Sequence, residues 1–60
     1  MLPNDPYLLL SVINMKLRDF DGDFATLCDH EDVDGQALLD KLATIGYVYV
    51  KEQNQFRPAE

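Results

Sequence analysis

The amino-acid sequence predicts an α+β fold that is mainly helical, with three helices followed by a C-terminal two-stranded β-hairpin. Three observations lead to this prediction. Up to Ile45, apolar residues recur at spacings of three and four, the period of an amphipathic helix. Aspartate stands just before each of these periodic segments, where a helix N-terminus favours it. Beyond Gly46, β-branched and aromatic residues alternate, which is the pattern of a strand.

The first helix is predicted over Pro6–Phe20. Asp5 is a suitable N-cap because its carboxylate can accept from free backbone N–H groups, and a proline at the first helical position loses no hydrogen bond. Apolar residues then form one broad buried face. Ser11, Asn14 and Arg18 fall on the opposite, polar side.

Two shorter helices follow. The segment Asp21–Asp23 breaks the periodicity, because glycine is poor in a helix interior and aspartate favours caps and turns. Asp23 then caps a second helix over Phe24–His30, and Asp34 caps a third over Gly35–Thr44.

The last part of the chain predicts the hairpin. Gly46 follows the last periodic residue, where a left-handed backbone conformation ends a helix at least cost. Tyr47–Val50 alternates as a strand, Glu52–Asn54 forms the turn, and Gln55–Arg57 returns before a proline ends the pairing.

This order of elements resembles a winged helix-turn-helix. The resemblance is imperfect, because Glu31 stands where an apolar residue is usual and Asp32 where the turn usually has glycine. The predicted core consists of the inward-facing apolar residues Leu9, Val12, Ile13, Leu17, Phe20, Phe24, Leu27, Val33, Leu38, Leu42, Ile45, Val48 and Phe56.

The length and composition indicate a single globular domain spanning residues 1–60, with 47% apolar and 27% charged residues. A chain this short buries only about 60% of the surface exposed by its unfolded form, so its core is small. The single cysteine, Cys28, excludes an internal disulfide. Because the N-terminus lacks the features of a secretory signal and its apolar run is too short to span a bilayer, we expect a cytoplasmic protein with no membrane partner.

The charge is strongly acidic, with eleven acids against five bases and a net charge of −6. Many of the acids lie in the segment Asp19–Asp40, which contains no lysine or arginine. Nucleic acid binding depends on basic residues that neutralise phosphates, so we do not expect nucleic acid as a partner. The alternative is an atypical winged-helix DNA-binding or regulatory protein, in which a dimer brings together the basic residues Lys16, Arg18, Lys51 and Arg57.

Three aspartates at alternate positions, Asp19, Asp21 and Asp23, raise the question of a calcium loop. Such a loop needs glycine at its sixth position and glutamate at its twelfth. Counted from Asp19, these positions hold Phe24 and His30. We therefore interpret the aspartates as capping residues between two helices and expect no metal site here.

A zinc site or a catalytic pair built on Cys28 and His30 is not expected either. A structural zinc site needs four ligands, and two residues that are two apart on a helix point about 200° away from each other. No glycine-rich phosphate loop is present, and a chain of this length has little room for a concave substrate pocket. We expect no enzymatic activity, no cofactor and no small-molecule substrate, although paired carboxylates such as Asp29 and Asp32 leave that question open.

The candidate interaction residues are Leu8, Met15, Tyr47 and Tyr49. Leu8 and Met15 lie on the flank of the apolar helix face, which makes that face wider than one small core can cover. Tyr47 and Tyr49 share one face of their strand; one strand face packs on the helices, and the other face, with the open edge, can bind a second copy or a partner's strand. Plain exposure to solvent is the alternative. The sequence therefore predicts a protein-protein interaction or self-association module with an acidic surface, as a homodimer or bound to another protein.

The segments MLPNDPYLLLSVINMKLRDF, LLDKLATIGYVY and NQF resemble those of a family of short bacterial proteins, about 60 residues long, that is known as a domain of unknown function. The resemblance covers nearly the whole chain. It implies a small cytoplasmic protein with no assigned activity, cofactor or catalytic residues. The chain departs from the family pattern at Glu31, where a leucine is expected, and at Gly35, where a better helix former is usual.

Overall fold

The computed structural model describes residues 2–59, so the two ends of the predicted domain, Met1 and Glu60, lie outside the described residues. In order along the chain, the elements are α1 (Pro6–Asp19), α2 (Phe24–Glu31), α3 (Gly35–Ala43), β1 (Tyr47–Val50) and β2 (Gln55–Pro58). The predicted mainly helical α+β fold with a C-terminal hairpin is confirmed. The resemblance to a winged helix stays a prediction.

Aspartate side chains begin all three helices, as the sequence predicts. Asp5 accepts a hydrogen bond from the Tyr7 N–H at 2.9 Å. Asp23 accepts from the backbone N–H of residue 26 at 3.0 Å, and Asp34 accepts from that of Gln36 at the same distance. Each bond satisfies an N–H group that has no partner within the helix, which explains why the helices begin at these residues.

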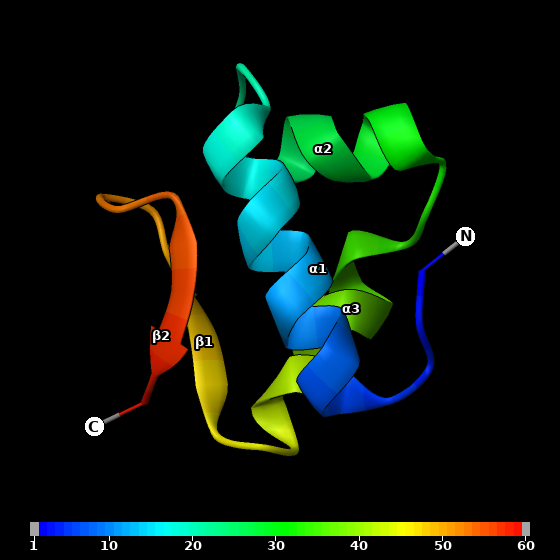
Figure 1. The fold of residues 1–60 in the computed structure, drawn as a ribbon, viewed down its shortest axis with the longest axis vertical. Helices are drawn as coiled ribbons and strands as arrows, with labels where there is room; N and C mark the ends of the chain where they lie inside the picture. Colours follow the sequence, from blue (N-terminus) through cyan, green and yellow to red (C-terminus); the bar gives the residue numbers. More distant parts are fainter. Residues whose placement is uncertain (1, 60) are drawn as a thin grey trace.

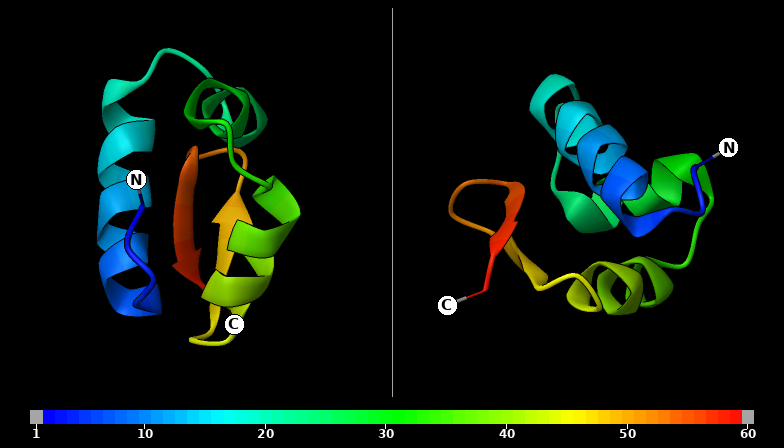
Figure 2. Two further views of the ribbon diagram at one scale, coloured as in Figure 1. Left: turned by 90° about the vertical axis from the view of Figure 1, so that its right-hand side faces the viewer. Right: turned by 60° about the horizontal axis from the view of Figure 1, so that its bottom comes forward.

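The three helices lie on one side of the hairpin (Figure 1). The left view of Figure 2 shows α1, β2, β1 and α3 in that order across the molecule, and α1 packs against β2 while α3 packs against β1. The two strands are antiparallel. The core lies between the helices and the hairpin, and it is formed by the buried residues Leu9, Ile13, Leu17, Phe24, Leu27, Cys28, Leu42 and Phe56.

Most of the predicted core is therefore confirmed. Phe20, Val33, Leu38 and Ile45 are only partly buried but pack against the buried cluster, and Val12 is partly buried outside that cluster. The prediction for Val48 is wrong, because this side chain is 43% exposed.

The exposure of Val48 follows from the pairing of the strands. Tyr49 lies opposite Phe56, and Val48 lies opposite Arg57. Directly paired residues share one face of a sheet, so the buried Phe56 brings Tyr49 to the inner face and leaves Val48 outside.

The length of the turn accounts for the wrong prediction. A turn over Glu52–Asn54 would pair Lys51 with Gln55 and place Val50 opposite Phe56. The observed pairing joins Val50 to Gln55, so the turn contains Lys51 as well. This difference of one residue in register moves every side chain of β1 to the opposite face.

The structure explains the three positions where the sequence departs from its expected pattern. Glu31 is only partly exposed and pairs with Lys16, with 3.5 Å between Oε2 and Nζ. Asp32 is the C-cap of α2 and has a left-handed backbone with φ of 58°. Gly35 lies against Cys28, because a Cβ atom at Gly35 would be 3.2 Å from the Cys28 Sγ.

Candidate functional site

A groove of about 540 Å³ lies between α1 and the hairpin. It brings together Met15 of α1 and Tyr47 of β1, two of the four predicted interaction residues. The other two do not line it: Leu8 is 59% exposed on α1, and Tyr49 packs into the core. The groove is lined by Leu10, Ser11, Asn14, Met15, Arg18, Tyr47, Gln55, Phe56, Arg57 and Pro58.

Asn14 holds the hairpin against α1 at the floor of this groove. Its Oδ1 accepts from the Phe56 N–H at 2.7 Å, and its Nδ2 donates to the Phe56 carbonyl at 3.1 Å. The Gln55 side chain donates to the Asn14 carbonyl at 3.0 Å. The predicted position of Asn14 on the polar side of the helix is therefore wrong, because β2 covers this side chain, whereas Ser11 and Arg18 are exposed as predicted.

These bonds also occupy the outer edge of β2, whereas within residues 2–59 the outer edge of β1 has no backbone partner. The Gly46 carbonyl accepts from the Ala59 N–H at 2.7 Å. Hydrogen-bonded and non-hydrogen-bonded residue pairs alternate along an antiparallel ladder, so the next hydrogen-bonded pair is Val48 with Arg57. The backbone groups of Tyr47 and Tyr49 therefore point away from β2, as those of Phe56 point away from β1. Within residues 2–59 the outward-pointing backbone groups of Tyr47 and Tyr49 have no backbone partner. They form the kind of edge to which a partner's strand can add.

The Tyr49 side chain is part of the core and not of an exposed surface. Its ring centroid lies 5.3 Å from that of Phe24 and 5.5 Å from that of Phe56. Its hydroxyl donates to the Asn54 Oδ1 at 2.5 Å and accepts from the Phe24 N–H at 3.3 Å. Asn54 in turn donates to the Gly22 carbonyl at 3.0 Å, so this network joins the hairpin turn to the α1–α2 loop.

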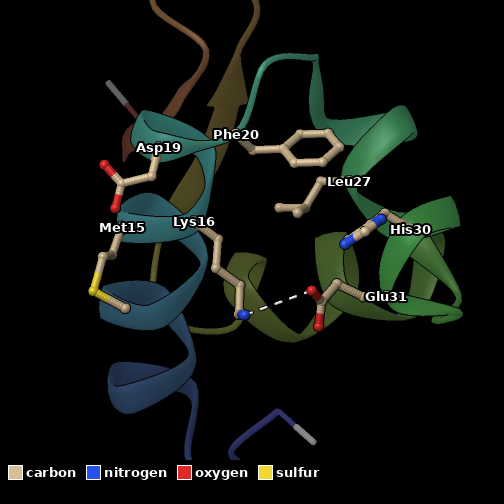
Figure 3. Close-up of a pocket in the computed structure, with 7 residues that line it drawn as sticks. All are labelled: Met15, Lys16, Asp19, Phe20, Leu27, His30 and Glu31. Atoms are coloured by element: carbon tan, nitrogen blue, oxygen red, sulfur yellow. Dashed lines mark ion pairs between the residues drawn. The ribbon is translucent and has the colours of Figure 1, made fainter.

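A second groove, of about 340 Å³, lies between α1 and α2 (Figure 3). Phe20 and His30 form one end, with 5.3 Å between their ring centroids, and the ion pair of Lys16 and Glu31 crosses it. Figure 3 shows that Met15 extends to the other side of α1, away from the ion pair. The described residues that line this groove include no serine, threonine or cysteine.

Cys28, the one thiol, is a buried residue of the core. Burial raises its pKa, and the nearby carboxylates of Asp34 and Asp29 raise it further. The thiol is therefore held in its unreactive neutral form. No three His, Cys, Asp or Glu side chains come together as a possible metal site within residues 2–59. In the same part of the chain, no helix has the length and apolar character needed to cross a membrane.

Several residues of the acidic segment have identifiable structural roles. Asp23 and Asp34 cap helices, Asp32 ends one, and Glu31 forms an ion pair. Asp40 accepts from the side-chain amide of Gln36 at 2.9 Å. Part of the acidic character is thus explained by the need to begin and end short helices.

The structure brings together two of the four basic residues whose clustering would favour DNA binding. Arg18 and Arg57 line the groove between α1 and the hairpin. Lys16 instead pairs with Glu31 beside α2. Residue patterns along the chain could not place these arginines together, because they lie on α1 and β2, far apart in the sequence.

Comparison with known proteins places the chain in a family. No match was found among curated proteins or among solved structures. A family model described as a domain of unknown function, DUF4250, matches residues 3–56 of the 60-residue chain. The chain therefore belongs to the DUF4250 family.

Proposed function

We propose that this chain is a non-catalytic interaction module of the cytoplasm that binds another protein chain through the exposed face of α1. One observation supports the proposal. The most exposed large apolar side chains of the described residues concentrate on this helix, where Tyr7 is 65%, Leu8 59% and Met15 47% exposed. Clustered apolar side chains on a surface are typical of a binding site, whereas single ones are ordinary.

The spacing of these residues fits a helical partner surface. Leu8 and Met15 are seven residues apart, which is close to two helical turns, so both lie on the same side of α1. Ser11 lies between them and is also exposed. Residues at this spacing are those with which a helix contacts a second helix or enters a groove.

The polar side of α3 supports a protein partner over nucleic acid. Asp34 and Asp40 place carboxylates there, and carboxylates repel phosphates. The Gln36 amide, which could bind a base edge, donates to Asp40 instead.

The oligomeric state and the captured partners together test the proposal. Sedimentation equilibrium over about 10 μM to 1 mM covers the range of weak self-association. The test variant is Leu8→Gln with Met15→Gln, and the matched control is Val48→Gln, which removes an exposed apolar side chain from the hairpin. The same three proteins, immobilised, are used to capture partners from the source cells.

We expect self-association, or capture of a specific protein, that is lost in the double variant and kept in the control. The circular dichroism spectra of all three should agree, since the substituted side chains are exposed. A monomer over the whole range, together with the same captured proteins for wild type and double variant, would contradict the proposal.

A further inference from the structure

We propose that the groove between α1 and the hairpin binds an acidic segment of a different protein, with Arg18 and Arg57 binding its carboxylates. This inference rests on the proposed interaction function and names the chemistry of the partner. It concerns the same side of the molecule, because Met15 lies both on the exposed face of α1 and in the groove.

Two of the three lysines already bind oxygen atoms of their own chain. Lys16 Nζ lies 3.5 Å from a carboxylate oxygen of Glu31. Lys41 Nζ donates to the side-chain oxygen of Asn4 at 2.6 Å and to the Asn4 carbonyl at 3.2 Å. Both ammonium groups therefore serve to hold α1 to α2 and α3 to the N-terminal segment.

The third lysine, Lys51, also has an internal acidic neighbour. Its charge contributes to lowering the pKa of Asp23, after the larger effect of the hydrogen bonds to Asp23 from residue 26. Within residues 2–59, the guanidinium groups of Arg18 and Arg57 form neither an ion pair nor a hydrogen bond, in contrast to the ammonium groups of Lys16 and Lys41. In a chain with eleven acids and five bases, these two arginines line the same groove, and within residues 2–59 no acid lines it.

The rest of the groove determines what kind of ligand fits. The amides of Asn14 and Gln55 are already hydrogen-bonded within the protein, so the guanidinium groups are its free strong donors. Leu10, Met15 and Tyr47 add apolar surface between them. A segment in which carboxylates alternate with apolar side chains matches this surface, because guanidinium groups bind carboxylates with two parallel hydrogen bonds.

A short acidic segment fits better than nucleic acid for an electrostatic reason. The net charge of −6 repels every phosphate of a long polyanion, whereas a peptide with a few carboxylates has little charge outside the groove. Phosphate backbones also have no apolar side chains to contact Met15 and Tyr47.

The test uses a short fluorescent peptide that alternates glutamate and leucine, and a second peptide in which glutamine replaces glutamate. Fluorescence anisotropy measures affinity, and ¹⁵N chemical shifts of the protein locate the site. We expect the glutamate peptide to shift signals of α1 and β2 and to lose at least about tenfold in affinity with Arg18→Gln plus Arg57→Gln. The glutamine peptide should bind no better to wild type than to this double variant.

Lys51→Gln is the matched control, because it removes one positive charge from outside the groove. Its effect should stay within about twofold, which is the size expected of a distant screened charge. Equal weakening by Lys51→Gln, or no binding at about 1 mM peptide, would overturn the inference. Duplex DNA that binds with the same arginine dependence would overturn it in favour of a phosphate ligand.

The two experiments distinguish an error in the acidic-segment inference from an error in the proposed function. If partner capture depends on Leu8 and Met15 while the glutamate peptide does not bind, the acidic-segment inference alone is wrong. If self-association, capture and peptide binding are all absent, both are wrong.

Discussion

Within residues 2–59, two residues other than glycine have a positive φ, and we predict that glycine will change stability in opposite directions at the two sites. Asp32 has φ of 58° at the end of α2, and Asn54 has φ of 52° in the hairpin turn. The backbone strain is therefore alike. The side chains differ, because Asp32 is exposed, whereas Asn54 is part-buried and hydrogen-bonded to Tyr49 and Gly22.

The magnitudes follow from this difference. A left-handed backbone costs a residue with a Cβ atom about 1 kcal/mol, and the freedom that glycine adds to the unfolded chain offsets about half of the gain. Asp32→Gly should therefore stabilise the fold by about 0.5 kcal/mol. Asn54→Gly gains the same amount but loses the two shorter side-chain hydrogen bonds, worth about 1 kcal/mol each, so we expect a net loss of about 1.5 kcal/mol.

Urea denaturation followed by circular dichroism measures both variants against wild type. The expected separation of about 2 kcal/mol corresponds to at least about 8 °C between their melting temperatures. Asn54→Asp is a useful control, since it keeps the acceptor for the Tyr49 hydroxyl and loses only the amide that donates to the Gly22 and Leu17 carbonyls. Equal stabilisation by glycine at both sites would show that the Asn54 network contributes nothing.

Three further predictions concern single side chains. Asn14→Asp replaces the donor to the Phe56 carbonyl with a second acceptor, so urea denaturation at neutral pH should show a loss of about 2 kcal/mol; an unchanged midpoint would contradict the role given to Asn14. Cys28 should react with a thiol reagent at least about a hundredfold more slowly in the folded than in the unfolded protein, because it is buried and its pKa is raised; equal rates would contradict its place in the core. The pKa of Asp23 is lowered from its ordinary value of 3.8, chiefly by the hydrogen bonds from Thr26. The stability that its carboxylate adds is therefore fully present above pH 3.8 and is lost as the pH falls through the folded pKa. Asp23→Asn keeps a cap that does not titrate, so below pH 3.8 its urea midpoint should rise relative to that of wild type. Urea midpoints of the two proteins that change with pH in parallel would contradict this role of the Asp23 carboxylate.

The sequence by itself determined the elements and their ends. Asp5, Asp23 and Asp34 accept hydrogen bonds from N–H groups two or three residues away, so their effect needs no knowledge of the rest of the fold. Helical periodicity likewise identifies the buried face of each helix, since it depends on neighbours within two turns. For this reason every helix and strand ends within one residue of its predicted end.

Only the tertiary structure decided which side of the hairpin faces the helices and which residues meet in the grooves. One residue more in the turn reversed the faces of β1, so Val48 became exposed and Tyr49 packs against the core. The bonds of Asn14 to Phe56 span 42 residues. Arg18 and Arg57 share a groove for the same reason: such contacts depend on how whole elements pack, and no local pattern of residues determines that packing.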